Sequence, residues 1–158
     1  MSPANNFSAV VPDANVLISL CAKEKDTYQP AKTAFDNYIN KGFEFFAPQV
    51  MVAEVIFVLC QKLHIGELTQ PTYEKAVKTF KDYMSFISAA PNGEASLIER
   101  CVEIRAGYGC SRSSDSLYIA LAEELSKTRP TELLTFDKGF INQAAKNAAT
   151  VTVNLLSI

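Results

Sequence analysis

Four acidic residues occupy conspicuous positions in this sequence. Asp13 and Asp137 each follow a short apolar run, FSAVVP and TELLTF respectively. Glu54 lies inside the apolar run VMVAEVIFVLC, and Asp115 lies near the start of SSDSLYIALAEEL. Carboxylates that converge repel one another and stay ionised together only beside a cation, for which Mg²⁺ and Mn²⁺ are the best suited ions. A cation held in this way can activate a bound water and neutralise charge on phosphoryl oxygens.

Glu54 is the acid that local structure explains least. Its neighbours one helical turn away on either side are all apolar, so no basic residue is available nearby. An ionised carboxylate left unpaired among apolar groups costs several kcal/mol. Glu54 must therefore be protonated, salt-bridged, bound to a metal or facing a cleft, and a metal or a distant partner is favoured.

The other three acids each have a structural explanation when considered alone. An Asp between a strand and a helix, as predicted for Asp13 and Asp137, is commonly an N-cap. Asp115 falls in the first turn of a predicted helix, where its charge interacts well with the helix dipole. Ser113 or Ser114 could cap that helix instead, which would leave the Asp115 side chain free for other interactions.

Strands and helices alternate along the chain. Apolar runs predict strands at residues 7–12, 43–48, 131–136 and 149–156, with a short extended piece at 87–91. Helical spacing predicts helices at residues 15–22, 29–41, 48–63, 71–87, 95–109, 113–127 and 138–147. The helix at 48–63 is apolar almost all round, which predicts burial in the core. The pattern predicts an α/β fold, a three-layer α/β/α sandwich with a mostly parallel central sheet.

Composition limits the class of protein. With 158 residues, of which 48% are hydrophobic, the chain suits one domain spanning residues 1–158. The most apolar stretch contains Glu54 and is too short to cross a membrane, and the N-terminus lacks the pattern of a secretory signal, so we expect a cytoplasmic protein without membrane contact.

The cysteines and the single histidine offer little chemistry. The four cysteines form no CxxC pair, which argues against a zinc site or disulfide framework and favours reduced thiols in the core. One histidine, His64, cannot supply both a general acid and a general base.

The net charge of −2 argues against a nucleic-acid partner, because phosphate contacts usually need a basic surface. If bound metal neutralises four carboxylates, however, the remainder of the chain is mildly cationic. This permits a polyanionic substrate.

The four acids together resemble the PIN-domain nucleases, including the VapC-type toxins of bacterial toxin–antitoxin pairs. In that family an acid closes the first strand, as in PDANVLISL, and a Glu lies within an apolar helix, as in VMVAEVIFVL. A third acid opens a helix of small residues, as in SSDSLYIALA, and a fourth follows a strand, as in LLTFDKGF. The resemblance covers about residues 13–140 in the same order and with similar spacing.

This resemblance implies a PIN-like fold and a Mg²⁺- or Mn²⁺-dependent endoribonuclease, with products bearing 5′-phosphate and 3′-hydroxyl ends. The metal-binding and catalytic acids would be Asp13, Glu54, Asp115 and Asp137, supported by Asn15 and Thr135. Members often carry a further acid two positions after the fourth, where this chain has Gly139, so the resemblance does not extend to a second metal. It also implies an antitoxin protein that inserts a basic residue among the acids.

Substrate contacts must come from other residues. Arg112 and Lys138, with Lys23 and Lys25, lie near the acids in the sequence and are candidates for phosphate binding. Tyr108 or Phe140 could stack an unpaired base. The modest basic surface predicts either weak, salt-sensitive binding of RNA or a homodimer that doubles the groove.

Two other functions remain open. A phosphohydrolase of the haloacid-dehalogenase kind also has an Asp after its first strand, but it needs D-x-D, and Asn15 replaces the second Asp here. The second alternative is a non-catalytic PIN-like module that binds RNA or protein without turnover.

Overall fold

A computed structural model describes residues 7–107, 109, 114–148 and 150–158. These residues form a five-stranded sheet in the order β3-β2-β1-β4-β5 in which every pair of neighbours is parallel. The strands are β1 (Ala9–Pro12), β2 (Glu44–Phe46), β3 (Ile87–Ser88), β4 (Thr131–Thr135) and β5 (Thr152–Leu155). All strands therefore end at the same edge of the sheet.

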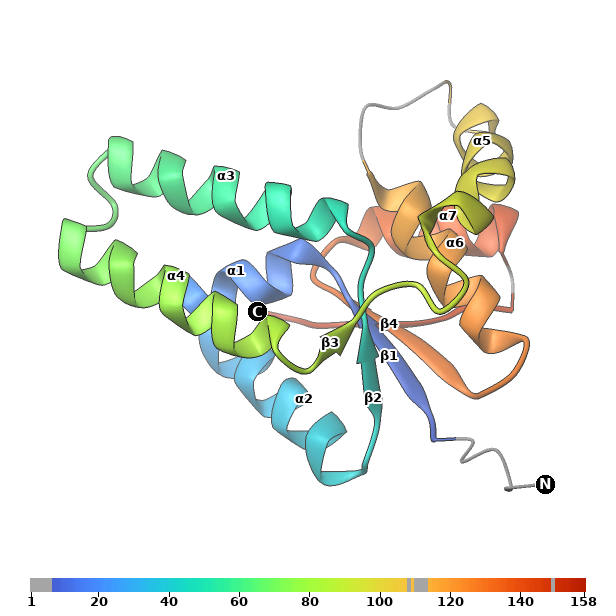
Figure 1. Cartoon of the computed structure of the whole chain (residues 1–158), viewed down its shortest axis with the longest axis horizontal. Coiled ribbons are helices and arrows are strands. Elements are labelled where there is room, and N and C mark those ends of the chain that lie inside the picture. Colours follow the sequence, from blue (N-terminus) through green and yellow to red (C-terminus); the bar gives the residue numbers. More distant parts are fainter. Residues whose placement is uncertain (1–6, 108, 110–113, 149) are drawn as a thin grey trace.

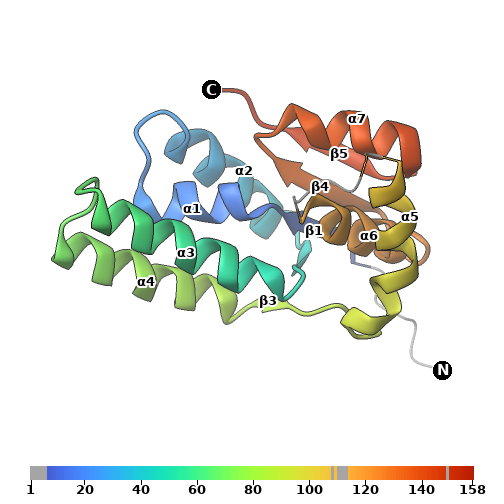
Figure 2. The ribbon, with the colours of Figure 1, turned by 90° about the horizontal axis from the view of Figure 1, so that it is seen from above.

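Helices cover both faces of the sheet. They are α1 (Ala14–Ala22), α2 (Tyr28–Asn40), α3 (Val50–His64), α4 (Gln70–Met84), the short 3₁₀ helix η1 (Glu94–Leu97), α5 (Ile98–Ala106), α6 (Asp115–Ser126) and α7 (Lys138–Asn147). Figures 1 and 2 show α1 to α4 on one side of the sheet and α5 to α7 on the other. The predicted three-layer α/β/α fold with a parallel sheet is thus confirmed.

The central strands are buried because helices cover them on both sides. Each residue of β1, AVVP, is buried, and in β4 only Glu132 is partly exposed. Such continuous apolar runs are typical of parallel strands. In the described part of the chain, no helix is both long and apolar enough to span a membrane.

The prediction that the helix at 48–63 is buried all round was wrong. Only one stripe of α3, formed by Met51, Val55 and Leu59, is buried. Ile56 and Phe57 remain 47% and 67% exposed, because α3 packs against α1 and α4 with one face alone. The opposite face of α3 is apolar and open to solvent.

The sequence suggested that the thiols lie in the core, but one of them does not. Cys21 and Cys101 are buried, but Cys60 is exposed on α3. Cys110 lies outside the described residues. His64 is exposed at the end of α3, away from the sheet edge where the strands end.

Candidate active site

Asp13 lies at the carboxyl edge of the sheet, where β1 ends and α1 begins. One oxygen of its carboxylate accepts a hydrogen bond from the amide of Ala14 at 2.7 Å, so Asp13 is the N-cap of α1. The other oxygen accepts a hydrogen bond from Thr135 Oγ1 at 2.9 Å. Because Thr135 ends β4, the parallel pairing of β1 with β4 brings together two residues 122 positions apart.

The pKa of Asp13 reflects its burial and the charges near it. The pKa is raised from 3.8 to about 7, chiefly because the side chain is buried. The hydrogen bond from Thr135 opposes this rise, whereas the negative charges of Asp115 and Glu54 add to it. Three acids from β1–α1, α3 and α6 therefore interact electrostatically.

Two hydroxyl groups of the described residues contact the carboxylate of Glu54. Tyr118 donates a hydrogen bond from its phenol to Oε2 of Glu54 at 2.6 Å, and the hydroxyl of Ser114 contacts Oε1. Burial raises the pKa of Glu54, the bond from Tyr118 lowers it, and the charge of Asp115 raises it. Within the described residues no lysine or arginine pairs with Glu54, so a salt bridge there does not explain its presence in an apolar helix.

Asp115 is the first residue of α6. Gln143 of α7 donates a hydrogen bond from Nε2 to Oδ2 of Asp115 at 2.9 Å. Ser114 precedes the helix at the N-cap position without making a side-chain cap bond, and its hydroxyl is directed to Glu54 instead. The predicted alternative cap, Ser113, lies outside the described residues.

Asp137 is placed differently from the other three acids. It is exposed and caps α7, accepting a hydrogen bond from the amide of Gly139 at 2.7 Å. Its own amide donates to Thr135 Oγ1 at 3.0 Å, so Thr135 links the backbone of Asp137 to the carboxylate of Asp13. Asp137 thus lies near Asp13 at the rim of the sheet edge, and the N-cap interpretation holds for both Asp13 and Asp137.

The donor set suits a hard divalent cation. All the side chains concerned offer oxygen, the type of ligand that Mg²⁺ and Mn²⁺ prefer. Asn15, two residues after Asp13, has a buried Oδ1 with no hydrogen-bond partner among the described atoms. A buried acceptor without a donor is unfavourable unless a ligand satisfies it. As the acids are placed, no three acidic, histidine or cysteine side chains in the described ranges form a complete metal cluster, so the acids would have to move closer together around an ion.

The residues expected to contact substrate differ in where they lie. Phe140 is fully buried and packs edge-on against Tyr118 at 6.2 Å between ring centroids, so it cannot stack on a base. Lys23 is the C-cap of α1, roughly 15 Å along the helix from Asp13. Lys138 is exposed at the first position of α7, next to Asp137. Arg112 and Tyr108 lie outside the described residues.

Sequence inspection missed the donors that hold the acids, namely Ser114, Tyr118 and Gln143. Tyr118 lies 64 residues from Glu54 in the chain, and nothing local to either residue indicates the contact. A weak indication exists for Tyr118, because it places a phenol directly before the small and aliphatic run IALA of α6. Buried phenols usually have a hydrogen-bond partner.

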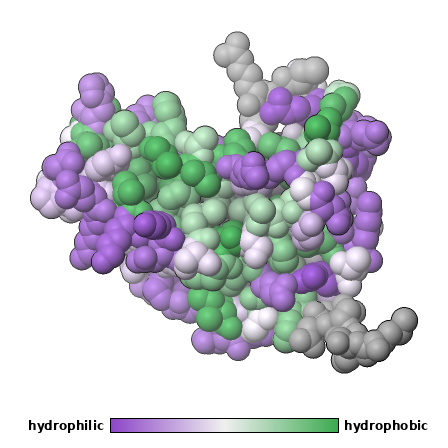
Figure 3. Space-filling model, viewed as in Figure 1, coloured by the Kyte–Doolittle hydropathy of each residue, from purple (hydrophilic) through white to green (hydrophobic). Residues whose placement is uncertain are grey.

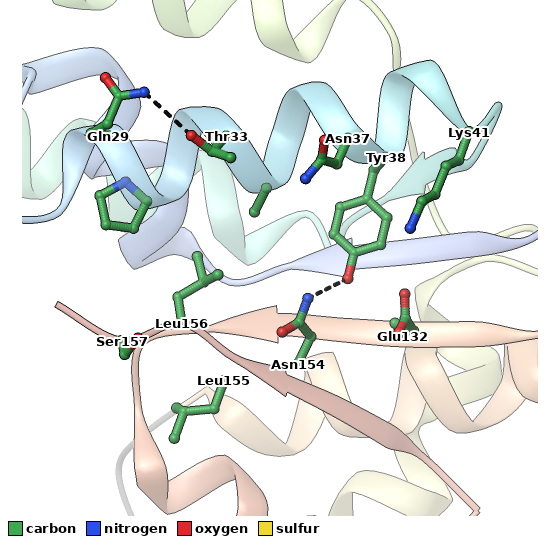
Figure 4. Close-up of a pocket in the computed structure, with 12 residues that line it drawn as sticks. Gln29, Thr33, Asn37, Tyr38, Lys41, Glu132, Asn154, Leu155, Leu156 and Ser157 are labelled. Carbon is green, nitrogen blue, oxygen red and sulfur yellow. Dashed lines mark hydrogen bonds between the residues drawn. The ribbon is translucent and has the colours of Figure 1, made fainter.

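A cavity of about 570 Å³ lies apart from these acids, between α2 and the edge strand β5 (Figure 4). Asn154 points toward Tyr38 and donates a hydrogen bond to its phenol at 2.8 Å. None of the described residues that line this cavity is one of the four acids. The cavity is therefore not the place where the chemistry of the acids occurs.

Comparisons with known proteins bear on the fold and the family of the chain. A search of curated protein sequences finds no significant match. Among solved structures, the chain is similar to a chain in the crystal structure of VapBC2 from Rickettsia felis bound to a DNA fragment from their promoter. The TM-score is 0.63 at 10% sequence identity, and the match covers 94% of this chain and 99% of the other, which shows a shared fold. The family model of the PIN domain matches residues 10–146, and the chain therefore belongs to the PIN-domain family.

Proposed function

We propose that this protein is a divalent-metal-dependent endoribonuclease, the toxin of a type II toxin–antitoxin pair. The observation that carries the proposal is the proximity of Asp13, Glu54 and Asp115 at one edge of the sheet. Ser114, the residue before Asp115, contacts Glu54, and the negative charges of Asp115 and Glu54 add to the rise in the pKa of Asp13 that burial causes. Carboxylates that lie near one another repel, and a bound divalent cation offsets that repulsion. The chain belongs to the PIN family, which generally comprises nucleases, so a cation at these acids would serve the hydrolysis of phosphodiester bonds.

In this proposal Asp13, Glu54 and Asp115 hold a Mg²⁺ or Mn²⁺ ion, and Asp137 supplies a fourth carboxylate from the rim. Asn15 supports the site with its unsatisfied amide oxygen, and Thr135 orients Asp13. The bound ion would supply a hydroxide near neutral pH and compensate charge on the phosphoryl oxygens.

The protein's own residues would position the substrate. Helices α1, α6 and α7 begin at or beside the acids, so their N-termini lie at this sheet edge and favour a phosphate group. Lys138 at the start of α7 is a candidate for contact with the RNA backbone, and Arg112 remains a second candidate. Hydrolysis would leave 5′-phosphate and 3′-hydroxyl ends.

The proposal is tested by cleavage of single-stranded RNA in the presence of Mn²⁺. We expect cleavage that stops on chelation. Substitution Glu54→Gln should lower the rate by at least about 100-fold, since loss of even an outer partner of a metal site costs about 10- to 100-fold. Glu74→Gln is the matched control, because it makes the same change at an exposed position on α4.

The result also decides between this proposal and a non-catalytic PIN-like module. RNA binding without any Mn²⁺-dependent cleavage by the folded wild-type protein would favour the binding module. Cleavage that persists in the Glu54→Gln protein would contradict the assignment of the acids.

We also propose a protein antitoxin and a homodimer. The similarity of the fold to a chain from a VapBC2 structure supports a partner protein. Exposed apolar side chains on two helices support self-association: Ile56 and Phe57 on α3, and Ile98 and Val102 on α5. Hydrophobic residues gather over α3 on the face shown in Figure 3. An adjacent gene encoding a small basic protein would favour the toxin role over general RNA processing.

A further inference from the structure

Tyr118 is a fully buried residue of α6 whose only polar side-chain atom meets a proposed metal ligand. Its phenol donates a hydrogen bond to Oε2 of Glu54 at 2.6 Å, and its ring packs edge-on against Phe140. A phenylalanine would fill nearly the same volume. The hydroxyl of Tyr118 is thus used for its contact with Glu54 rather than for packing.

The contact joins two helices at the proposed site. Ser114 and Tyr118 lie four positions apart and approach the two oxygens of the same carboxylate. Glu54, which belongs to α3, is therefore tied to the beginning of α6, where Asp115 is located. Without these bonds the half-buried Glu54 would be able to turn toward solvent, because Phe57, one turn further along the same face of α3, is exposed.

Resting on the proposed function, we propose that Tyr118 is a positioning residue that holds the Glu54 carboxylate beside Asp115, ready to bind a divalent cation. A carboxylate has about four acceptor sites, so the bond from the phenol leaves others for the ion. Such outer partners fix the orientation of the ligand and raise the affinity of the site for its metal. Tyr118 itself touches neither the ion nor the RNA.

The test measures Mn²⁺ affinity directly, by electron paramagnetic resonance of the free ion during titration of the full chain. Tyr118→Phe keeps the ring and removes the hydroxyl, and we expect the Kd for Mn²⁺ to rise about 10-fold or more. Tyr38→Phe is the matched control. It also removes a buried phenol hydroxyl, one that accepts a hydrogen bond from Asn154, but it lies away from the acids. Its Kd should equal that of the wild type.

A double variant separates positioning from a general loss of structure. In the Glu54→Gln background, Tyr118→Phe should leave the Kd unchanged, because the phenol acts through that carboxylate. An equal rise in both backgrounds would overturn the inference, since Tyr118 would then be acting on the fold alone. A Tyr118→Phe protein that does not fold would also overturn the inference, because the hydroxyl would then be required by the fold.

The two proposals fail in different ways. If Glu54→Gln weakens Mn²⁺ binding and Tyr118→Phe binds as the wild type does, the positioning role is wrong and the proposed metal site stands. If the folded wild-type protein binds no Mn²⁺, the proposed function is overturned together with this inference.

Discussion

Each of the three interacting acids accepts a hydrogen bond from an uncharged side chain on another element. Thr135 of β4 donates to Asp13, Tyr118 of α6 donates to Glu54, and Gln143 of α7 donates to Asp115. Such donors orient a carboxylate without neutralising it. In the described part of the chain, no lysine or arginine forms an ion pair with Asp13 or Glu54, so a divalent cation would be the charge that compensates them when they are ionised.

Asp13 and Glu54 should make the metal-free protein less stable as pH rises. The pKa of Asp13 is about 7 in the folded protein and near 3.8 when unfolded, so between these values the folded state binds more protons. The free energy of unfolding then falls as pH increases, by up to roughly 4 kcal/mol for Asp13 between pH 4 and 8. Glu54 adds to the effect in the same direction, because its pKa is also raised.

Urea denaturation at several pH values, with chelator present, measures this dependence. Asp13→Asn should flatten the profile and raise stability at pH 8, whereas Asp82→Asn at an exposed site on α4 should leave the profile unchanged. Added Mn²⁺ should stabilise the wild type most at high pH, where the acids are ionised. A metal-free protein whose stability rises from pH 5 to 8 would contradict the account.

At the scale of helices and strands, the sequence predicted most of the fold because each element carries its own pattern. The four buried or edge strands and the long helices follow from local apolar spacing. The prediction that α3 is buried was wrong because its apolar residues lie on two different faces of the helix, one packed against the core and one exposed to solvent. Met51 and Val55 face the core, whereas Phe57 faces solvent, and apolar composition does not distinguish the two.

The site was predictable only in part, for a related reason. Parallel strands end at one edge, so the meeting of Asp13 with β4 follows from the fold class. The contact of Glu54 with Tyr118 depends instead on how α3 and α6 pack at long range, which no local pattern determines.

Helix α7 allows the two roles of Asp137 to be separated. Asp137→Ala should lower the free energy of unfolding by about 1 kcal/mol, because the helix loses its N-cap. Asp137→Asn should keep the stability, since Asn caps a helix equally well, but should weaken Mn²⁺ binding if Asp137 contributes charge to the site. Chemical denaturation and Mn²⁺ titration of both variants measure these effects. An Asn variant that matches the wild type in both would leave Asp137 with the capping role alone.

At the scale of the whole molecule, the exposed apolar face of α3 is the main feature that one chain leaves unexplained. Soluble monomers rarely expose large contiguous apolar patches, and such patches usually mark an interface. A homodimer through this face would also double the groove and the basic side chains available to one RNA, which suits a chain of net charge −2 with few basic contacts of its own.

Light scattering after size-exclusion chromatography tests the dimer. We expect the wild type to have twice the mass of one chain, and Phe57→Glu to be a monomer because it buries a charge in the interface. Ile39→Glu, which adds the same charge at an exposed apolar position on α2, should remain a dimer. A monomeric wild type would contradict the dimer.

The central claim is that the acids at the sheet edge share one divalent ion. Anomalous diffraction from crystals soaked in Mn²⁺ tests it most directly, because the signal locates the metal itself. We predict a peak within bonding distance of the carboxylates of Asp13, Glu54 and Asp115. A map with no peak at these carboxylates under saturating Mn²⁺, or with manganese bound only elsewhere on the protein, would contradict the claim.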